Sequence, residues 1–152
     1  MLGYWVPPVL WMAFIFWLST DQFSGANTGS VLESILQALG LSFSTESLNL
    51  IHFLVRKLAH LSGYAILALL LYRAFRGGSE TRWYSRWAMA AFAVAAIYAL
   101  LDEYHQSWTA QRTASVRDSL IDMMGSLIAL CSIRISSSNQ QSVRDEETSP
   151  ER

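Results

Sequence analysis

Residues 57–72 read KLAHLSGYAILALLLY, in which Lys57, His60 and Tyr64 mark the beginning of a long apolar run. Leu58–Tyr72 carries no charged residue, and neither does Met1–Thr20 or Trp87–Leu101. A bilayer core of about 30 Å is crossed by about 20 helical residues. Uncharged runs of this kind are therefore typical of helices that span a membrane.

The composition of the whole chain favours a membrane protein. Of its 152 residues, 52% are hydrophobic and only 15% are charged, and the net charge is −1; a soluble domain has about 45–50% and about 25%. One soluble core could not hide so much apolar surface behind so few charges. The composition excludes a soluble globular enzyme and a strongly basic nucleic-acid binder. The single Cys131 excludes an internal disulfide and a Cys-rich metal site.

Four segments are long and apolar enough to span the membrane, at about 3–20, 50–72, 84–104 and 116–134. The predicted fold is all-α, a four-transmembrane-helix bundle that forms one membrane domain over 1–135. Residues 136–152 are rich in Ser, Gln and Glu without apolar periodicity, which predicts a disordered tail. The first segment could instead be a cleavable signal peptide, but it lacks the positively charged start of one.

The loop between the first two spans carries a helical pattern of its own. Its apolar residues recur at helical spacing before Gly40, a residue that commonly ends a helix; they are Val31, Leu32, Ile35, Leu36 and Leu39. We expect a short helix that lies at the membrane surface.

The arginines predict the orientation. The loop between the second and third spans carries Arg73, Arg76, Arg82 and Arg86 with Glu80, and the tail carries Arg134 and Arg144. The first loop has acidic residues and no Lys or Arg. The positive-inside rule therefore predicts a multi-pass membrane protein whose middle loop and both termini are cytoplasmic.

Helix arithmetic places polar residues of three spans at one depth. Lys57, Asp102 and Asp118 each lie sixteen residues from an arginine that marks the inner boundary. Each is then about 24 Å above that boundary, or about 6 Å below the outer one. His60 and Asp122 come out deeper, at about 18–20 Å, with Tyr64 near the midplane.

The spacing also places these residues on common helix faces. The three faces consist of Lys57, His60 and Tyr64; of Asp102, His105 and Gln106; and of Asp118, Asp122 and Gly125. An isolated charge costs about 3 kcal/mol at membrane depth, so these groups should face one another or a polar pocket, and such a cluster is by default a functional site. Alternatively, Lys57 with Asp118 or Asp102 is a structural ion pair that sets helix register.

These residues carry a family resemblance. Lys57-x-x-His60-x-x-x-Tyr64 resembles the second-span signature of the VanZ-like family, and Asp102-Glu103-Tyr104-His105-Gln106 resembles its second signature. Arg112, Ser115 and Asp118 before Gly125 continue that second signature, and Ser19-Thr20 is similar to the end of the family's first span. The resemblance covers about 2–135 and implies a four-helix protein of the bacterial cell envelope, located in the bacterial cytoplasmic (inner) membrane. One member is known for low-level teicoplanin resistance. Many relatives have Asn where this chain has Asp122.

The first functional hypothesis is an enzyme whose partner is a membrane lipid or a lipid-linked envelope precursor in the outer leaflet. The candidate catalytic residues, which would act as general acids and bases, are His60, Asp102, Glu103, His105 and Asp118. The candidate substrate-binding residues are Lys57, Tyr64, Gln106, Arg112, Arg117 and Asp122. The sequence does not identify a cofactor. A metal ion is one candidate, because mixed N/O ligands are offered by Glu103, His105, Asp118 and Asp122.

Two further hypotheses use the same residues. A non-catalytic protein could bind a headgroup, an antibiotic or a proton with this cluster, although four short helices enclose little volume for a transporter. Alternatively, the cluster locks a structural bundle. The sequence leaves homo-oligomerisation open.

Overall fold

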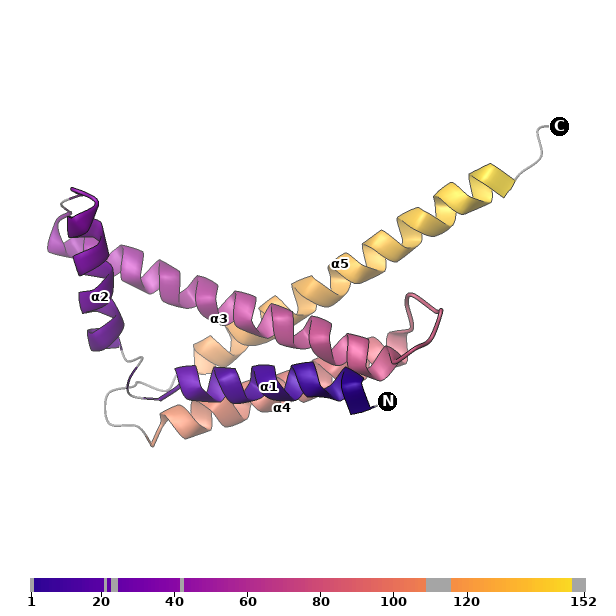
Figure 1. The fold of residues 1–152 in the computed structure, drawn as a ribbon, viewed down its shortest axis with the longest axis horizontal. Helices are drawn as coiled ribbons and strands as arrows, with labels where there is room; N and C mark the ends of the chain where they lie inside the picture. The colour runs from indigo at the N-terminus through magenta and orange to yellow at the C-terminus, as the bar shows by residue number, and fades with distance from the viewer. Residues whose placement is uncertain (1, 21, 23–24, 42, 109–115, 149–152) are drawn as a thin grey trace.

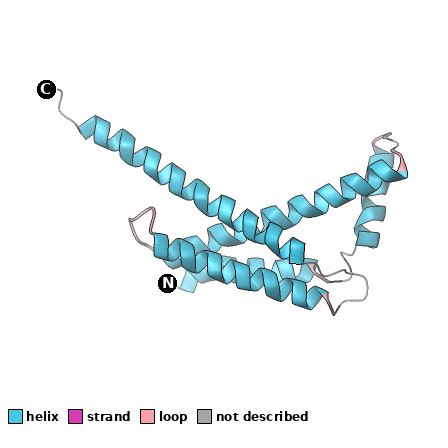
Figure 2. Cartoon of the chain, turned by 180° about the vertical axis from the view of Figure 1, so that it is seen from behind, coloured by secondary structure: helices cyan, strands magenta, loops and turns pink. Residues whose placement is uncertain are grey.

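The computed structural model describes residues 2–20, 22, 25–41, 43–108 and 116–148. These residues form five helices and no strand (Figures 1 and 2). They are α1 (Leu2–Leu18), α2 (Gly25–Ala38), α3 (Thr45–Arg76), α4 (Ser85–Gln106) and α5 (Val116–Thr148). The predicted all-α fold is confirmed.

Three of the described helices are long and apolar enough to cross a membrane, and they are α3, α4 and α5. α1 is apolar but has only 17 residues, about 26 Å at 1.5 Å per residue. Many large apolar side chains remain exposed on the outside of the bundle, such as Leu58 of α3, Ile97 of α4 and Leu127 of α5. Such a surface is typical of helices surrounded by lipid rather than water.

The crossing of α3 and α5 organises the bundle (Figure 1). A Cβ atom on Gly125 would lie 2.1 Å from the carbonyl oxygen of Leu61, so only glycine lets the two backbones approach this closely. Beside it, the Ser126 hydroxyl donates to the carbonyl of Tyr64 at 3.2 Å. Small residues at a membrane helix interface commonly serve this purpose. On α4, the buried stripe consists of Ala88, Ala91, Ala95 and Ala99.

Two side-chain hydrogen bonds attach α1 to the bundle. The indole Nε1 of Trp11 donates to the carbonyl of Gly63 on α3 at 2.8 Å. The hydroxyl of Tyr98 on α4 donates to the carbonyl of Met12 at 2.6 Å. Because lipid tails give helices little hydrophobic reason to associate, such bonds help to hold a short apolar helix in place.

The short helix expected in the first loop is α2, which stands across the N-terminal part of α3 (Figure 2). Gly40 has φ +72°, and the N–H of Leu41 donates back to the carbonyl of Leu36 at 2.9 Å. This glycine-dependent C-terminal cap ends the helix where the sequence predicts. Ser44 then caps α3 by accepting from the Ser47 N–H at 3.3 Å.

α5 continues past Ile135 to Thr148, so residues 136–148 of the segment expected to be a disordered tail are helical in the structure, while 149–152 lie outside the described residues (Figure 1). A helix that is already nucleated adds each further residue at little cost. The serine hydroxyls also find partners within the helix, as Ser137 does by donating to the Ile133 carbonyl at 2.8 Å. Because of its polar composition this segment has no apolar face to pack against other helices, but it still forms a helix.

Candidate functional site

The N-terminal parts of α3 and α5 meet through an ion pair between Lys57 and Asp118. Arg56 adds a second cation, with its Nη2 atom 4.0 Å from Asp118 Oδ2. The Asp118 side chain is 5% exposed, whereas those of Lys57 and Arg56 are 22% and 28% exposed. The carboxylate therefore lies inside the bundle and the two cations lie at its edge, with Lys57 over the Phe53 ring at 5.2 Å from its centroid.

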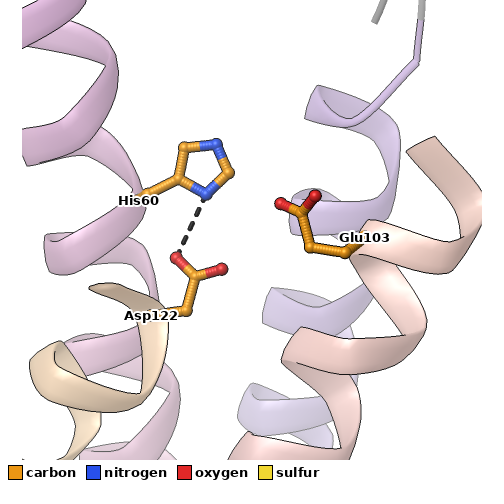
Figure 3. A group of neighbouring side chains, drawn as sticks. All are labelled: His60, Glu103 and Asp122. Atoms are coloured by element: carbon orange, nitrogen blue, oxygen red, sulfur yellow. Dashed lines mark hydrogen bonds and ion pairs between the residues drawn. The ribbon is translucent and has the colours of Figure 1, made fainter. Parts of the chain in front are cut away.

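One helical turn further along α3 and α5, His60 contacts Asp122. The Nδ1 atom of His60 lies 3.1 Å from Asp122 Oδ1, and the Asp122 side chain is fully buried. Glu103 of α4 is buried and points its carboxylate toward this pair (Figure 3). Since Nδ1 is engaged with Asp122, Nε2 is the nitrogen of His60 that faces away from that carboxylate (Figure 3).

These three side chains form a candidate metal site. His60, Glu103 and Asp122 each offer a ligand atom, and these atoms lie within 4.8 Å of one another. One imidazole and two carboxylates suit zinc or another first-row divalent ion, with positions left for water or substrate. Of the four metal ligands considered from the sequence, Glu103 and Asp122 belong to this group, and His60 is its third member.

A hydrogen-bonded group on α4 lies beside these residues. Gln106 Nε2 donates to Asp102 Oδ2 at 3.0 Å and lies 3.5 Å from the hydroxyl of Ser19, which directly follows α1. All three side chains are buried. We use the name polar layer for Lys57, His60, Asp102, Glu103, Gln106, Asp118 and Asp122 together.

A cavity of about 240 Å³ opens against the polar layer between α1, α2, α3 and α4. His60, Tyr64 and Asp102 line it on the polar side, and Arg56 lines it as well. Apolar walls come from Ile15, Leu18, Leu32, Val55 and Ala59. At the far side, the hydroxyl of Thr28 and the His52 ring lie 2.8 Å apart and join α2 to α3. The cavity therefore combines an apolar wall with ionisable groups.

Tyr64 has an unusual hydroxyl. The residue is 1% exposed, and its hydroxyl oxygen has no hydrogen-bond partner among the described residues. A buried polar atom without a partner costs about 1–3 kcal/mol. Because Tyr64 lines the cavity, a bound molecule is a natural partner for this hydroxyl.

The structure separates the predicted site residues into groups. It brings together His60, Glu103 and Asp122; Lys57 and Asp118; and Asp102 and Gln106, while Tyr64 lines the cavity. The His105 ring instead lies against Phe16 of α1, with ring centroids 4.3 Å apart. Arg117 is exposed. Arg112 and Ser115 lie outside the described residues.

Sequence reasoning missed Arg56 and Ser19 as members of the site. Arg56 precedes Lys57 directly and reaches Asp118 from the next position. Ser19 was marked only by the resemblance, because a serine at the end of a span has many other roles.

Comparison with known proteins agrees with the resemblance in the sequence. The model of the VanZ/LLP1 family matches residues 4–137. A search of curated proteins and a search of solved structures each found no match. The match runs from the first turn of α1 into α5 and includes every residue of the polar layer, and the chain therefore belongs to the VanZ/LLP1 family.

Proposed function

We propose that this protein binds the polar headgroup of a membrane lipid, or of a lipid-linked cell-envelope precursor, and acts on it by general acid/base chemistry. The single observation that carries the proposal is the cavity, in which apolar walls meet His60, Tyr64 and Asp102. A lipid is the ligand class that presents both an apolar part and a polar part to one site.

The size of the cavity limits the ligand. A volume of about 240 Å³ is smaller than the roughly 300–1,000 Å³ of sites for drug-sized molecules. It fits a headgroup with a few carbon atoms of its chain, whereas a glycopeptide antibiotic is many times larger. A link to teicoplanin resistance is therefore proposed through an altered envelope lipid or precursor, and not through binding of the antibiotic itself.

The His60–Asp122 pair supplies the acid/base chemistry. A carboxylate that holds one ring nitrogen orients the imidazole and leaves the other nitrogen to accept or donate a proton. Glu103 lies across from the pair and is the second group that could carry the proton. The His105 ring, which lies against Phe16, has no part in this scheme.

Arg56 and Lys57 would hold an anionic headgroup by charge-assisted hydrogen bonds. Arg56 lines the cavity, and both cations keep some exposure beside Asp118. The distribution of arginines supports an inner membrane location with this end of the bundle in the outer leaflet. That leaflet is where lipid-linked envelope precursors are used.

The test is to incubate envelope lipid extract with the protein in nanodiscs. Lipid species are measured by mass spectrometry before and after incubation, and the lipid retained by the purified protein is identified. The variants are His60→Gln and Asp122→Asn, which keep hydrogen-bonding capacity but weaken proton transfer. Ser62→Ala is the matched control, since its hydroxyl is exposed and bonds only to carbonyls of its own helix.

We expect wild type and Ser62→Ala to convert one lipid species and both site variants to lose about 10²–10⁴-fold in rate. Thermal unfolding should show that all four proteins are folded. Retention of a lipid without conversion would select a non-catalytic binding protein. Equal lipid retention by wild type and by a variant that fills the cavity, Ala59→Trp, would overturn the lipid proposal altogether.

Metal-assisted chemistry is a second candidate, favoured by the proximity of the His60, Glu103 and Asp122 ligand atoms. A divalent ion there would polarise a phosphoryl or carbonyl oxygen or activate water. The test is the metal content of the purified protein with added Zn²⁺ or Mn²⁺. About one ion per chain, lost in both Glu103→Gln and Asp122→Asn but kept in Ser62→Ala, supports this candidate; no retained ion contradicts it.

A further inference from the structure

The end of the bundle opposite to the polar layer holds a second and larger cavity, of about 910 Å³. It lies between the start of α1, the end of α3, the α3–α4 loop and α5. Its charged lining residues are Arg73, Arg76, Arg82 and Glu80, and its polar lining includes Tyr4 and Ser136. We call this cavity the arginine pocket. Nothing in the proposed function uses it.

The three arginines are not neutralised within the described part of the chain, where none of them forms an ion pair with a carboxylate. Arg76 is the most constrained, because its Nε atom is buried and has no hydrogen-bond partner among the described residues. A buried guanidinium N–H without an acceptor is costly. An anion in the pocket would provide that acceptor, and guanidinium groups suit the geometry of phosphate.

The surrounding contacts hold the arginines in place. The hydroxyl of Tyr72 on α3 donates to the carbonyl of Arg82 at 2.7 Å and accepts from the N–H of Tyr84 at 3.1 Å. The Tyr72 ring also stacks on Trp83, with centroids 5.6 Å apart. The loop is therefore fastened to α3, which keeps Arg82 on the same side of the bundle as Arg73 and Arg76.

Aromatic residues at this end of the bundle indicate that the arginine pocket lies at the membrane–water interface. Trp5, Trp83, Tyr84 and Trp87 gather there, with Trp5 packed edge-on against Phe75 at 5.1 Å. Trp and Tyr are enriched at membrane–water interfaces, and basic pockets between helices at that level commonly hold anionic headgroups. The cavity volume also lies in the range of small-molecule sites.

We propose that the arginine pocket binds a phosphate group, carried by an anionic phospholipid at the membrane interface. The site is distinct from the polar layer, so this proposal stands or fails independently of the proposed function. The pocket is defined by its excess of positive charge, because its lining carries three guanidinium groups and one carboxylate.

The test uses the full chain in detergent, with phosphatidylglycerol, phosphatidylcholine and inorganic phosphate as probes, and retained probe measured by native mass spectrometry. We expect wild type to retain phosphatidylglycerol in preference to phosphatidylcholine. Arg76→Gln and Arg73→Gln should each weaken retention by about tenfold through loss of a charge-assisted contact. Arg73 is exposed, so its replacement tests the pocket even where Arg76→Gln fails to fold.

Arg134→Gln and Arg86→Gln are the matched controls, since they remove the same charge from exposed arginines that do not line the pocket. Both should retain the lipid as wild type does. If inorganic phosphate competes for the pocket and neither lipid is preferred, the phosphate site is supported. The bound phosphate would then come from a soluble compound and not from a lipid. Equal weakening by Arg134→Gln and Arg73→Gln, or no retention of any probe, would overturn the proposal.

Discussion

Replacing the Tyr64 hydroxyl tests ligand binding without lowering the stability of the protein. Because this buried hydroxyl has no partner among the described residues, Tyr64→Phe removes an unsatisfied group and keeps the shape of the ring. We expect thermal unfolding of the variant to be unchanged or to rise, by up to about 1 kcal/mol in free energy. The rate of lipid conversion should fall about tenfold, since the ligand loses its partner. An unchanged rate would remove Tyr64 from the site.

The Lys57–Asp118 ion pair permits a separation of structural and functional roles. Asp118→Asn leaves Lys57 and Arg56 without their carboxylate, and we expect a loss of about 2 kcal/mol in unfolding free energy. The loss is below the roughly 3–5 kcal/mol of a fully buried pair, because both cations keep some exposure. Combining Lys57→Met with Asp118→Leu should restore most of the stability.

Activity then decides between the two roles of this pair. If the double variant is stable but inactive, the pair takes part in ligand handling. If it is stable and active, the pair only sets the register of α3 against α5. Denaturation in mixed micelles and the lipid conversion assay measure the two quantities separately.

At the level of elements, the α3–α5 crossing depends on one glycine. In Gly125→Ala the new methyl would lie 2.1 Å from the Leu61 carbonyl oxygen, so the two backbones must separate. We expect a loss of about 1–3 kcal/mol or more in unfolding free energy, together with loss of the His60–Asp122 contact that the crossing positions. Gly63→Ala on α3 is the matched control, because nothing lies within 4 Å of its Cβ position. Equal behaviour of the two variants would contradict the close approach.

The sequence predicted the helices and the levels at which polar residues of α3 and α5 meet, and the reason is physical. Depth follows from the rise of 1.5 Å per residue, and a charge in lipid must find a partner. Lys57 was thus expected to meet Asp118 or Asp102, and in the structure its partner is Asp118. The same arithmetic brought His60 and Asp122 to one level, one turn deeper.

Rotation about the helix axis was harder to predict than depth. His105 lies about 60° to one side of Asp102 on a helical wheel and Gln106 about 40° to the other. Both positions are compatible with a shared polar face. The structure turns Gln106 inward toward Asp102 and places His105 against Phe16. Which neighbour occupies each side depends on tertiary packing, and periodicity in one helix carries no information on that.

The end of α5 shows a second limit. Its last turns lack apolar periodicity, which predicted disorder, yet the helix continues to Thr148. Composition indicates whether a segment has an apolar face that can pack against the rest of the protein. A helix that has already formed can extend through residues that lack such a face.

For the whole molecule, the open question is whether α1 crosses the membrane. Its 17 residues correspond to about 26 Å, slightly less than the bilayer core of about 30 Å. Helices of this length cross when the bilayer thins locally. Trp11 and Met12 bond α1 to α3 and α4 deep in the bundle, which favours a crossing. With α1 included, both termini lie on one side; without it, they lie on opposite sides.

Cysteine labelling in intact cells distinguishes the two topologies. In a Cys131→Ser background, single cysteines are placed at exposed positions as Gly3→Cys, Ser34→Cys, Thr81→Cys and Ser138→Cys. The positive-inside rule predicts that the arginine-rich α3–α4 loop is cytoplasmic, so Thr81→Cys and Ser138→Cys should resist a membrane-impermeant maleimide until the cells are permeabilised. Ser34→Cys should react at once. If α1 crosses, Gly3→Cys is protected like Thr81→Cys; if Gly3→Cys instead reacts together with Ser34→Cys, α1 lies along the outer surface and the bundle spans the membrane with α3, α4 and α5 alone.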